Sequence, residues 1–414
     1  MTRVVAGRAA AAADAVDGVR PAAVVEPGSV EEAAAALRDA AAAGQALAFR
    51  GGGSKLGLGN PPERLDLLVS TARLDQVLEH AAGDLVVKVQ GGVRLADLQA
   101  ALAPAGQQLG LDPPEPGATV GGVVAANASG PRRLRYGTAR DLIIGITVVL
   151  ADGTVAHAGG KVVKNVAGYD LAKLFCGSLG TLGLVAEAVF RLHPVPEAAG
   201  TVALEVRRPA DARAAVGRLL RATVEPSAVE LAWPEPAAPG RLTVLLEGIR
   251  PGVEARVAAT ADLLGAGAQG GVADPDAPAP RLGALPWPAD GGGPVVGVKA
   301  ACPPAELDGA VGDLWAAADA AGVGCRLTAH AGSGVLRAAL PWAGTDALAA
   351  ALAAARRRLV ARGGSLVLVE APVELKRAVE VWGPAGDALE LMRRVKRRFD
   401  PEGRLAPGRF VGGI

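Results

Sequence analysis

The feature that most constrains how this 414-residue chain can fold is a pair of stretches made almost entirely of small residues. The first is "FRGGGSKLG" (49–57), which follows the short apolar run "ALAF" (46–49), and the second is "PEPGATVGGVVAANASG" (114–130). A glycine triplet alone indicates little, because the chain has 56 glycines and a second triplet at 291–293. Two separate loops without bulky side chains, however, let the backbone approach a ligand closely. Together they predict a long, flat ligand that lies along both.

The first loop does not fit the two common phosphate-binding motifs. A Walker loop needs Lys followed by Ser or Thr, but here the order is Ser54–Lys55. A dinucleotide fingerprint opens a helix, but this stretch runs into Pro61–Pro62. A glycine turn after a strand still presents several N–H groups in a concave nest, which suits a pyrophosphate.

Composition and charge exclude several classes of function. Lys plus Arg is 43 and Asp plus Glu is 42, so no strong field favours nucleic acid or an acidic lipid surface. The apolar runs are interrupted well before the roughly 20 residues that a membrane span needs. Asp14 and Asp17 interrupt the N-terminal apolar run, which argues against a signal peptide. We therefore expect a cytoplasmic protein, at most peripheral to the inner membrane through partners.

The cysteines restrict redox chemistry. Cys176, Cys302 and Cys325 are too few for a four-thiolate iron–sulfur cluster. If such a cluster takes part in the reaction, another chain must carry it.

Local signals predict an α+β fold with mixed sheets. Ser29 as N-cap, Glu32 three residues later and Gly44 as the stop bracket an alanine-rich helix. Asp152–Gly153 is the expected turn of a hairpin within 142–159. The basic run "RRVKRRFD" (393–400) is expected to be the solvated face of a late helix.

Composition also indicates domain limits, because Pro194 and Pro196 end the first half and a Pro/Gly-rich stretch at 268–294 interrupts the second. The predicted division is an N-terminal extension (1–19), a first domain (20–196), an α+β cap (197–385) and a C-terminal segment (386–414).

Five stretches carry a family resemblance: "FRGGGSK", "PGATVGGVVAANASGPRR", "ARDLIIGITVVLADG", "KVVKNVAGYDLAKLFCGSLGTLG" and "FDPEGRLAPGRF". They resemble FAD-binding proteins of the vanillyl-alcohol oxidase/p-cresol methylhydroxylase (PCMH) type, and within that family the FAD-binding E subunits of bacterial glycolate oxidases. The resemblance is strong over about 20–200 and the last 25 residues, and weak between. It implies a PCMH-type FAD domain of two α+β subdomains, to which the C-terminal segment returns.

The resemblance also implies which residues bind FAD. The first loop would face the pyrophosphate, the second would run along the same cofactor, and 180–183 would lie near the adenine. The candidates are Arg50, Gly51, Gly52, Gly53, Ser54, Lys55, Pro116, Gly117, Ala118, Thr119, Gly121, Gly122, Ala126, Ser129, Asp141, Asn165, Tyr169, Gly180, Thr181 and Gly183. Members that attach FAD covalently in this loop have histidine where this chain has Ser54, so noncovalent binding is expected. Without the resemblance, Gly180 and Gly183 could simply be turn residues.

The cap differs from relatives that oxidise D-2-hydroxy acids through a bound divalent metal. Their "HAGDGNLH"-like segment corresponds to "HAGSGVLR" (330–337), where His330 is retained but Arg337 replaces the second histidine. Glu370 is the candidate for their glutamate, and Ala371 stands in place of the third histidine. A cation repels a divalent metal, so we predict no metal, assign no catalytic residue, and expect His330 to be structural.

The resemblance implies the FAD-binding subunit of a glycolate oxidase complex, which supports oxidation of glycolate to glyoxylate and electron transfer to an acceptor. Its implied partners are a larger homologous FAD subunit and an iron–sulfur subunit, with a small 2-hydroxy acid as substrate. One alternative is a standalone FAD-dependent 2-hydroxy-acid dehydrogenase or oxidase. Another is a non-catalytic flavoprotein scaffold.

Overall fold

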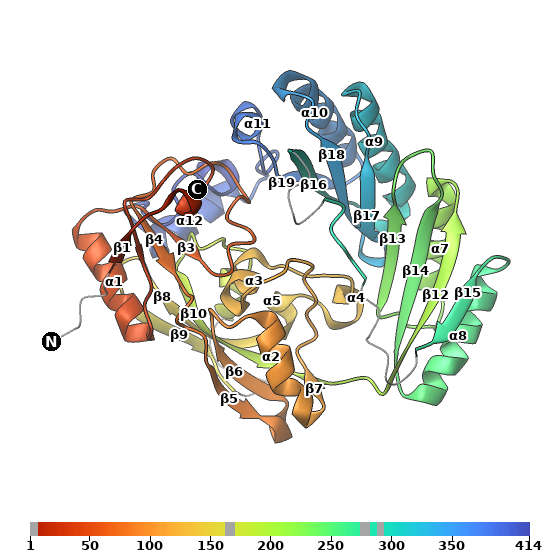
Figure 1. Cartoon of the computed structure of the whole chain (residues 1–414), viewed down its shortest axis with the longest axis horizontal. Coiled ribbons are helices and arrows are strands. Elements are labelled where there is room, and N and C mark those ends of the chain that lie inside the picture. Colours follow the sequence, from red (N-terminus) through yellow and green to blue (C-terminus); the bar gives the residue numbers. More distant parts are fainter. Residues whose placement is uncertain (1–6, 162–169, 274–281, 288–293) are drawn as a thin grey trace. The chain divides into compact units, whose positions relative to one another are not determined.

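The computed structural model describes residues 7–161, 170–273, 282–287 and 294–414. Two compact units can be distinguished. Unit 1 comprises residues 1–129, 137–195 and 384–414, and unit 2 comprises 130–136 and 196–383. Most of their helices and strands are labelled in Figure 1.

Unit 1 is built on two principal sheets. The four-stranded sheet has the order β1-β2-β4-β3, with β1 (Gly7–Ala9), β2 (Ala23–Val25), β3 (Leu47–Arg50) and β4 (Leu67–Ser70). The five-stranded antiparallel sheet has the order β5-β6-β10-β8-β9, with β5 (Val77–Ala81), β6 (Val86–Gln90), β8 (Ile143–Val149), β9 (Val155–Gly159) and β10 (Leu184–Arg191). A short ladder joins β7 (Gln107–Gln108) to β11 (His193–Pro194).

Helices cover these sheets and bury their apolar sides. The helices of unit 1 are α1 (Val30–Ala42), α2 (Leu95–Leu102), α3 (Val120–Ala126), α5 (Ala139–Leu142), α6 (Ala172–Phe175) and α12 (Leu389–Phe399). The largest core cluster of unit 1 joins α2 and α3 to one face of the five-stranded sheet, through residues such as Leu98, Val124 and Phe190. A second cluster packs α1 against both sheets around Leu37 and Leu47.

The local signals of unit 1 are confirmed. The Ser29 side chain accepts a hydrogen bond from the Glu32 N–H at 3.1 Å and begins α1. Gly153 has φ +82°, and the Asp152 carboxylate accepts a hydrogen bond from the Thr154 N–H at 2.8 Å, so these residues form the turn between β8 and β9. Short-range hydrogen bonding and a left-handed glycine are sufficient to specify both features.

The C-terminal segment returns to unit 1, as predicted. Residues 404–410 follow α12 and lie beside the start of β3 and the loop after it. The Leu47 N–H donates to the Arg404 carbonyl at 2.9 Å, and the Ala406 N–H donates back to the Leu47 carbonyl at 2.7 Å. The Asn60 N–H donates to the Arg409 carbonyl at 3.0 Å. The tail therefore supports the first glycine loop over a sequence separation of about 350 residues.

The basic run 393–400 covers the end of α12 and its C-cap, but the solvated-face prediction is wrong for two members, Lys396 and Asp400. Lys396 is buried, and its ammonium donates to the Thr181 carbonyl, the Leu405 carbonyl and the Asp400 carboxylate at 3.0, 2.8 and 2.6 Å. Burial lowers the pKa of Lys396, while Asp400 opposes that shift. The lysine thus ties the tail to the segment before β10, and its three acceptors offset the cost of burying an ammonium group.

Unit 2 is one eight-stranded antiparallel sheet covered by helices on one face. Its order is β15-β12-β14-β13-β17-β18-β16-β19. The strands are β12 (Ala198–Val206), β13 (Ala228–Trp233), β14 (Gly240–Gly248), β15 (Gln269–Val272), β16 (Val295–Ala301), β17 (Arg326–His330), β18 (Val335–Pro341) and β19 (Ser365–Glu370). The helices are α4 (Arg133–Tyr136), α7 (Pro209–Arg221), α8 (Arg250–Leu264), α9 (Leu307–Ala320), α10 (Thr345–Ala361) and α11 (Val373–Ala378). Side chains of α7 to α10 share one core cluster with alternate residues of the strands.

The unit limits differ from the predicted domain limits at two segments. Residues 130–136 were expected in the first domain, but they pack with unit 2. Arg132 forms an ion pair with Glu247 at 3.0 Å, and the Tyr136 hydroxyl donates to the same carboxylate at 3.3 Å. The residues expected to form an N-terminal extension contribute β1 to the four-stranded sheet.

Within the described residues, no helix is both long and apolar enough to span a membrane.

Candidate functional site

The two glycine loops of unit 1 lie against each other. A Cβ on Gly51 would overlap the Thr119 hydroxyl, and a Cβ on Gly52 would overlap the carbonyl oxygen of Gly117. The absence of side chains at 51 and 52 is therefore already required by contact between the loops. This adds a second reason for the glycines beside the close ligand approach that the sequence predicts.

Gly53 is needed for a different reason. A Cβ there would have only ordinary contacts at 4.0 Å, but the residue has φ +78°, which L-residues with a side chain rarely adopt. Within the described chain, the backbone N–H groups of Gly52, Gly53 and Ser54 donate to no other group. Such a row of unused donors on a turn is suited to bind an anion.

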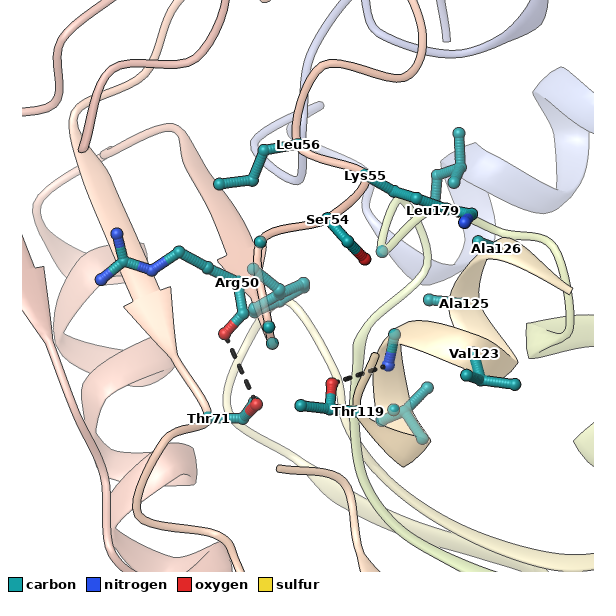
Figure 2. Close-up of a pocket in the computed structure, with 18 of the residues that line it drawn as sticks. Arg50, Ser54, Lys55, Leu56, Thr71, Thr119, Val123, Ala125, Ala126 and Leu179 are labelled. Carbon is teal, nitrogen blue, oxygen red and sulfur yellow. Dashed lines mark hydrogen bonds between the residues drawn. The ribbon is translucent and has the colours of Figure 1, made fainter. Parts of the chain in front are cut away.

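The loops border a cleft with about 940 Å³ of free space, including the part open to solvent. This volume fits a ligand of cofactor size rather than a single ion. Figure 2 shows Ser54 and Thr119 on facing sides of the cleft, while the Arg50 side chain points away from Ser54.

Most of the predicted FAD residues line this cleft. Those that do are Arg50, Gly51, Gly52, Gly53, Ser54, Lys55, Ala118, Thr119, Gly121, Gly122, Ala126, Gly180 and Gly183. Pro116, Gly117, Ser129, Asp141 and Thr181 do not line it. The Asp141 carboxylate instead accepts hydrogen bonds from the N–H and hydroxyl of Thr138 at the start of α5. Asn165 and Tyr169 lie outside the described residues.

Other lining residues were missed by the sequence analysis. They are Ala48, Phe49, Leu56, Leu58, Thr71, Val123, Ala125, Ala128, Leu179, Leu184, Val185, Ala406 and Arg409. Most are apolar, and six of them lie inside β3, α3 or β10, where no motif distinguishes them from ordinary core residues. Ala406 and Arg409 belong to the quoted stretch "FDPEGRLAPGRF", so that stretch was a usable signal for them.

Arg50 is held by a buried carboxylate from the N-terminal segment. The Asp14 carboxylate accepts from Arg50 and from Arg8, both at 2.7 Å, and its own side chain is 4% exposed. The hydrogen bonds from Arg8 and Arg50 hold the pKa of Asp14 well below its usual range. The Arg50 side chain is thus fixed and neutralised beside the cleft.

Lys55 and Glu115 form an ion pair that joins the two glycine loops. Two of the cations that line the cleft, Arg50 and Lys55, are therefore already paired with carboxylates. An anionic ligand in the cleft would be bound chiefly by backbone N–H groups and by the Ser54 and Thr119 hydroxyls.

Arg409 supports the first loop from the C-terminal tail. Its guanidinium donates to the carbonyls of Leu56 and Leu58 at 2.5 and 2.6 Å. Burial lowers the pKa of Arg409, while Asp17 opposes that shift. The loop conformation therefore depends on a residue that a local sequence window does not contain.

In unit 2, the predicted lone histidine has two partners. His330 Nδ1 lies 2.8 Å from a Glu230 carboxylate oxygen, and Nε2 lies 2.5 Å from the Arg337 guanidinium. Glu230, His330 and Arg337 are 6%, 2% and 8% exposed. The described residues contain no group of three or more His, Cys, Asp or Glu that could hold a metal ion.

Comparison with known protein families defines the class of unit 1. Residues 21–159 match the FAD binding domain family, and residues 380–410 match the C-terminal domain of FAD linked oxidases. These two segments are similar to the corresponding parts of FAD-linked oxidases, which confirms the predicted FAD cofactor and supports the predicted oxidoreductase class. Most residues that line the glycine-loop cleft fall in the matched segments, while those between 179 and 185 lie outside both.

Three curated proteins illustrate the range of similarity. Glycolate oxidase subunit GlcD of Bacillus subtilis (strain 168) is 37% identical over 51% of this chain and 45% of its own length. Glycolate oxidase subunit GlcE of Escherichia coli (strain K12) is 38% identical over 39% of this chain and 46% of its own length. D-lactate dehydrogenase of Archaeoglobus fulgidus is 40% identical over 41% of this chain and 38% of its own length. The matches thus span less than half the length of each of these relatives.

Similarity to solved structures extends further along the chain. An alkyldihydroxyacetonephosphate synthase structure superposes with a TM-score of 0.70 over 94% of this chain and 76% of that one, at 20% sequence identity. At this identity the similarity defines the fold alone, and it confirms the predicted α+β PCMH-type architecture.

Proposed function

We propose that this chain is the FAD-binding subunit of a glycolate oxidase complex, which supports oxidation of glycolate to glyoxylate and passes electrons to an acceptor on another subunit. The main support is the similarity to two glycolate oxidase subunits, GlcD and GlcE, at 37% and 38% identity over 51% and 39% of this chain. The proposed partners are a larger homologous FAD subunit and an iron–sulfur subunit. The second candidate, favoured by the match to D-lactate dehydrogenase, is a standalone 2-hydroxy-acid dehydrogenase.

The chain's own residues fit FAD in the cleft. Gly52, Gly53 and Ser54 offer N–H donors for the pyrophosphate, and Thr119 offers a hydroxyl on the facing loop. The Ser54 hydroxyl in place of a histidine supports noncovalent binding. When bound, FAD supplies the acceptor for the two electrons that a 2-hydroxy acid loses with its α-hydrogen and hydroxyl proton.

A role as an accessory subunit, rather than as the subunit that oxidises the substrate, is supported by the side chains around His330 in unit 2. A bound metal lowers the barrier to oxidation by polarising the substrate oxygen. In the described part of unit 2, the position next to His330 holds the Arg337 guanidinium. A guanidinium carries one diffuse charge and cannot coordinate a hydroxyl oxygen as a metal ion does. Losing one electrostatic contribution of this kind typically costs on the order of 100- to 1000-fold in rate.

Anaerobic stopped-flow reduction tests the proposal. The purified FAD-loaded chain is mixed with glycolate or D-lactate, first alone and then with the homologous larger subunit and the iron–sulfur subunit. We expect slow flavin reduction alone and fast reduction in the complex. Bleaching within seconds without a partner would instead establish the standalone dehydrogenase.

A further inference from the structure

A segment that precedes the family match contacts the first glycine loop. Residues 7–19 lie before residue 21, where the match to the FAD binding domain family begins. This segment adds β1 to the four-stranded sheet, and a short 3-10 helix (Ala12–Asp14) follows the strand. The last residue of that helix, Asp14, reaches Arg50 at the end of β3, directly before the loop. The family match therefore does not cover every part of the chain that contacts the loop.

Asp14 is a buried carboxylate that accepts hydrogen bonds from three residues. Its side chain is 4% exposed. Arg8 donates to its two oxygens at 2.7 and 2.9 Å. Arg50 donates to one of these oxygens at 2.7 Å, and the Ala11 N–H donates to the other at 2.7 Å. Hydrogen bonds between charged groups are among the strongest in proteins, so they hold Asp14 and Arg50 in one arrangement.

Arg50 is held at both of its ends. Asp14 holds the side chain, and the Arg50 carbonyl accepts from the Thr71 N–H at 2.9 Å and from the Thr71 hydroxyl at 3.4 Å (Figure 2). The next residues are the glycines 51–53. Because glycine has the greatest backbone freedom, the conformation of this loop depends on the residues that anchor its ends. Arg50 is the anchor at the first end.

The same N-terminal segment also supports the far end of the loop. Ala10 and Val16 belong to a small core cluster, and Leu56 packs against that cluster. The Leu56 carbonyl accepts a hydrogen bond from Arg409. Burial lowers the pKa of Arg409 and Asp17 opposes that shift, so Asp17 acts on the group that holds this carbonyl. The segment therefore acts on both ends of the loop that presents the N–H donors to the cleft.

We infer that Asp14 is a positioning residue for the cofactor, which acts through Arg50 to hold the first glycine loop in the conformation whose N–H groups bind the FAD pyrophosphate. Asp14 does not line the cleft, so it acts only through the residue that it holds. A loop that is ordered in advance loses less conformational entropy on binding, and this raises the affinity for the ligand. This role rests on the proposed function in one respect, that FAD occupies the cleft, and the choice of substrate plays no part in it.

Unit 2 contains a matched cluster that separates positioning from a contribution to stability. The Asp313 carboxylate accepts from Arg358 at 2.7 Å and from Arg362 at 2.9 Å, and its side chain is 8% exposed. Like Asp14, it is a buried aspartate held by two arginines, but it lies in unit 2 and does not line the cleft. Removing either carboxylate takes a partner from two arginines, which is destabilising. Both changes should therefore lower stability, and only one should change FAD binding.

A dilution series of the FAD-loaded full chain, followed by the fluorescence of the released FAD, tests the inference. We compare the wild-type chain with Asp14→Asn, Arg50→Met, the double variant and the control Asp313→Asn, at a temperature at which urea unfolding shows each variant to be folded. Asparagine has nearly the size of aspartate but no charge, so it weakens the link without leaving a cavity. Arg50→Met breaks the link from the other side and leaves Asp14 paired with Arg8, so it reports even if Asp14→Asn fails to fold.

We expect Asp14→Asn and Arg50→Met each to raise the FAD dissociation constant about 10-fold, and Asp313→Asn to leave it within about 2-fold of the wild-type value. The double variant should bind FAD no more weakly than the weaker single variant, because both changes remove the same contact.

Unchanged FAD affinity in either single variant would overturn the inference, as would losses that multiply in the double variant. Tighter binding by Asp14→Asn would also overturn it, because Asp14 would then restrain Arg50 from contacting the phosphates. An equal loss in Asp313→Asn would show that FAD affinity merely follows stability, which contradicts a positioning role. None of these results needs a substrate, so failure of the proposed function in stopped-flow is recognised separately.

Discussion

Gly52→Ala is the sharpest test of how the glycine-loop cleft is built. A methyl group at this position would overlap the backbone carbonyl oxygen of Gly117, whereas real Cβ contacts essentially never come closer than 3.0 Å. A backbone atom cannot rotate away as a side chain can, so one loop must move. Overpacking that forces backbone shifts typically costs about 1–3 kcal/mol. We therefore expect unit 1 to lose about 2 kcal/mol of stability even without FAD.

The ligand effect adds to this loss. Displacing either loop moves the N–H donors of residues 52 to 54 from their places at the cleft, so FAD affinity should fall by at least the roughly 30-fold that 2 kcal/mol represents. Urea unfolding of the apoprotein measures the first effect, and fluorescence titration with FAD measures the second.

Two matched variants separate the causes. Gly122→Ala places its methyl group 3.2 Å from the Thr119 hydroxyl, and a small movement of that side chain relieves the contact. The variant should therefore lose much less stability than Gly52→Ala. Gly44→Ala has φ +61° but nothing within 4 Å, and it lies outside the cleft. It should cost about 1–2 kcal/mol from backbone strain while FAD affinity stays unchanged. If Gly52→Ala leaves the apoprotein as stable as wild type and weakens only FAD binding, the loop-contact reasoning is wrong and close approach of the ligand alone requires the glycine.

The remaining predictions concern the cofactor and two buried groups. Acid precipitation of the FAD-loaded chain should release all flavin into the supernatant, and yellow colour in the washed pellet would contradict noncovalent binding. Lys396→Met should lower the free energy of unfolding, measured with urea, by about 3–5 kcal/mol, because it leaves the buried Asp400 carboxylate without its cation. The control Arg397→Met, on the exposed side of α12, should change the free energy of unfolding by less than about 0.5 kcal/mol. The pKa of His330 is lowered from 6.5 to about 2 in the folded protein. Between these pH values the unfolded chain takes up a proton on this histidine and the folded chain does not. The free energy of unfolding should therefore fall by up to about 1.4 kcal/mol per pH unit as the pH decreases from 6.5. His330→Gln should show a shallower slope between pH 6.5 and 4.5, and an equal slope would refute the assignment.

The sequence alone determined features that depend on neighbouring residues. Ser29 caps α1 and Asp152–Gly153 turns the hairpin, because both use hydrogen bonds and dihedral angles within four residues. The glycine loops also marked the cofactor region, since their composition is unusual whatever they contact. The family motifs supplied the FAD cofactor and the fold.

Only the tertiary structure decided which distant groups meet. Lys396 looked like any other member of a basic run, yet the turn it shares with Asp400 is buried against residue 181. His330 looked isolated until β13 and β18 brought Glu230 and Arg337 to it. The identity of the group that excludes a side chain at Gly52 was likewise hidden, because it is a carbonyl 65 residues away. Long-range pairing sets these contacts, and burial then makes each of them obligatory, since an unpaired polar group inside the protein is costly.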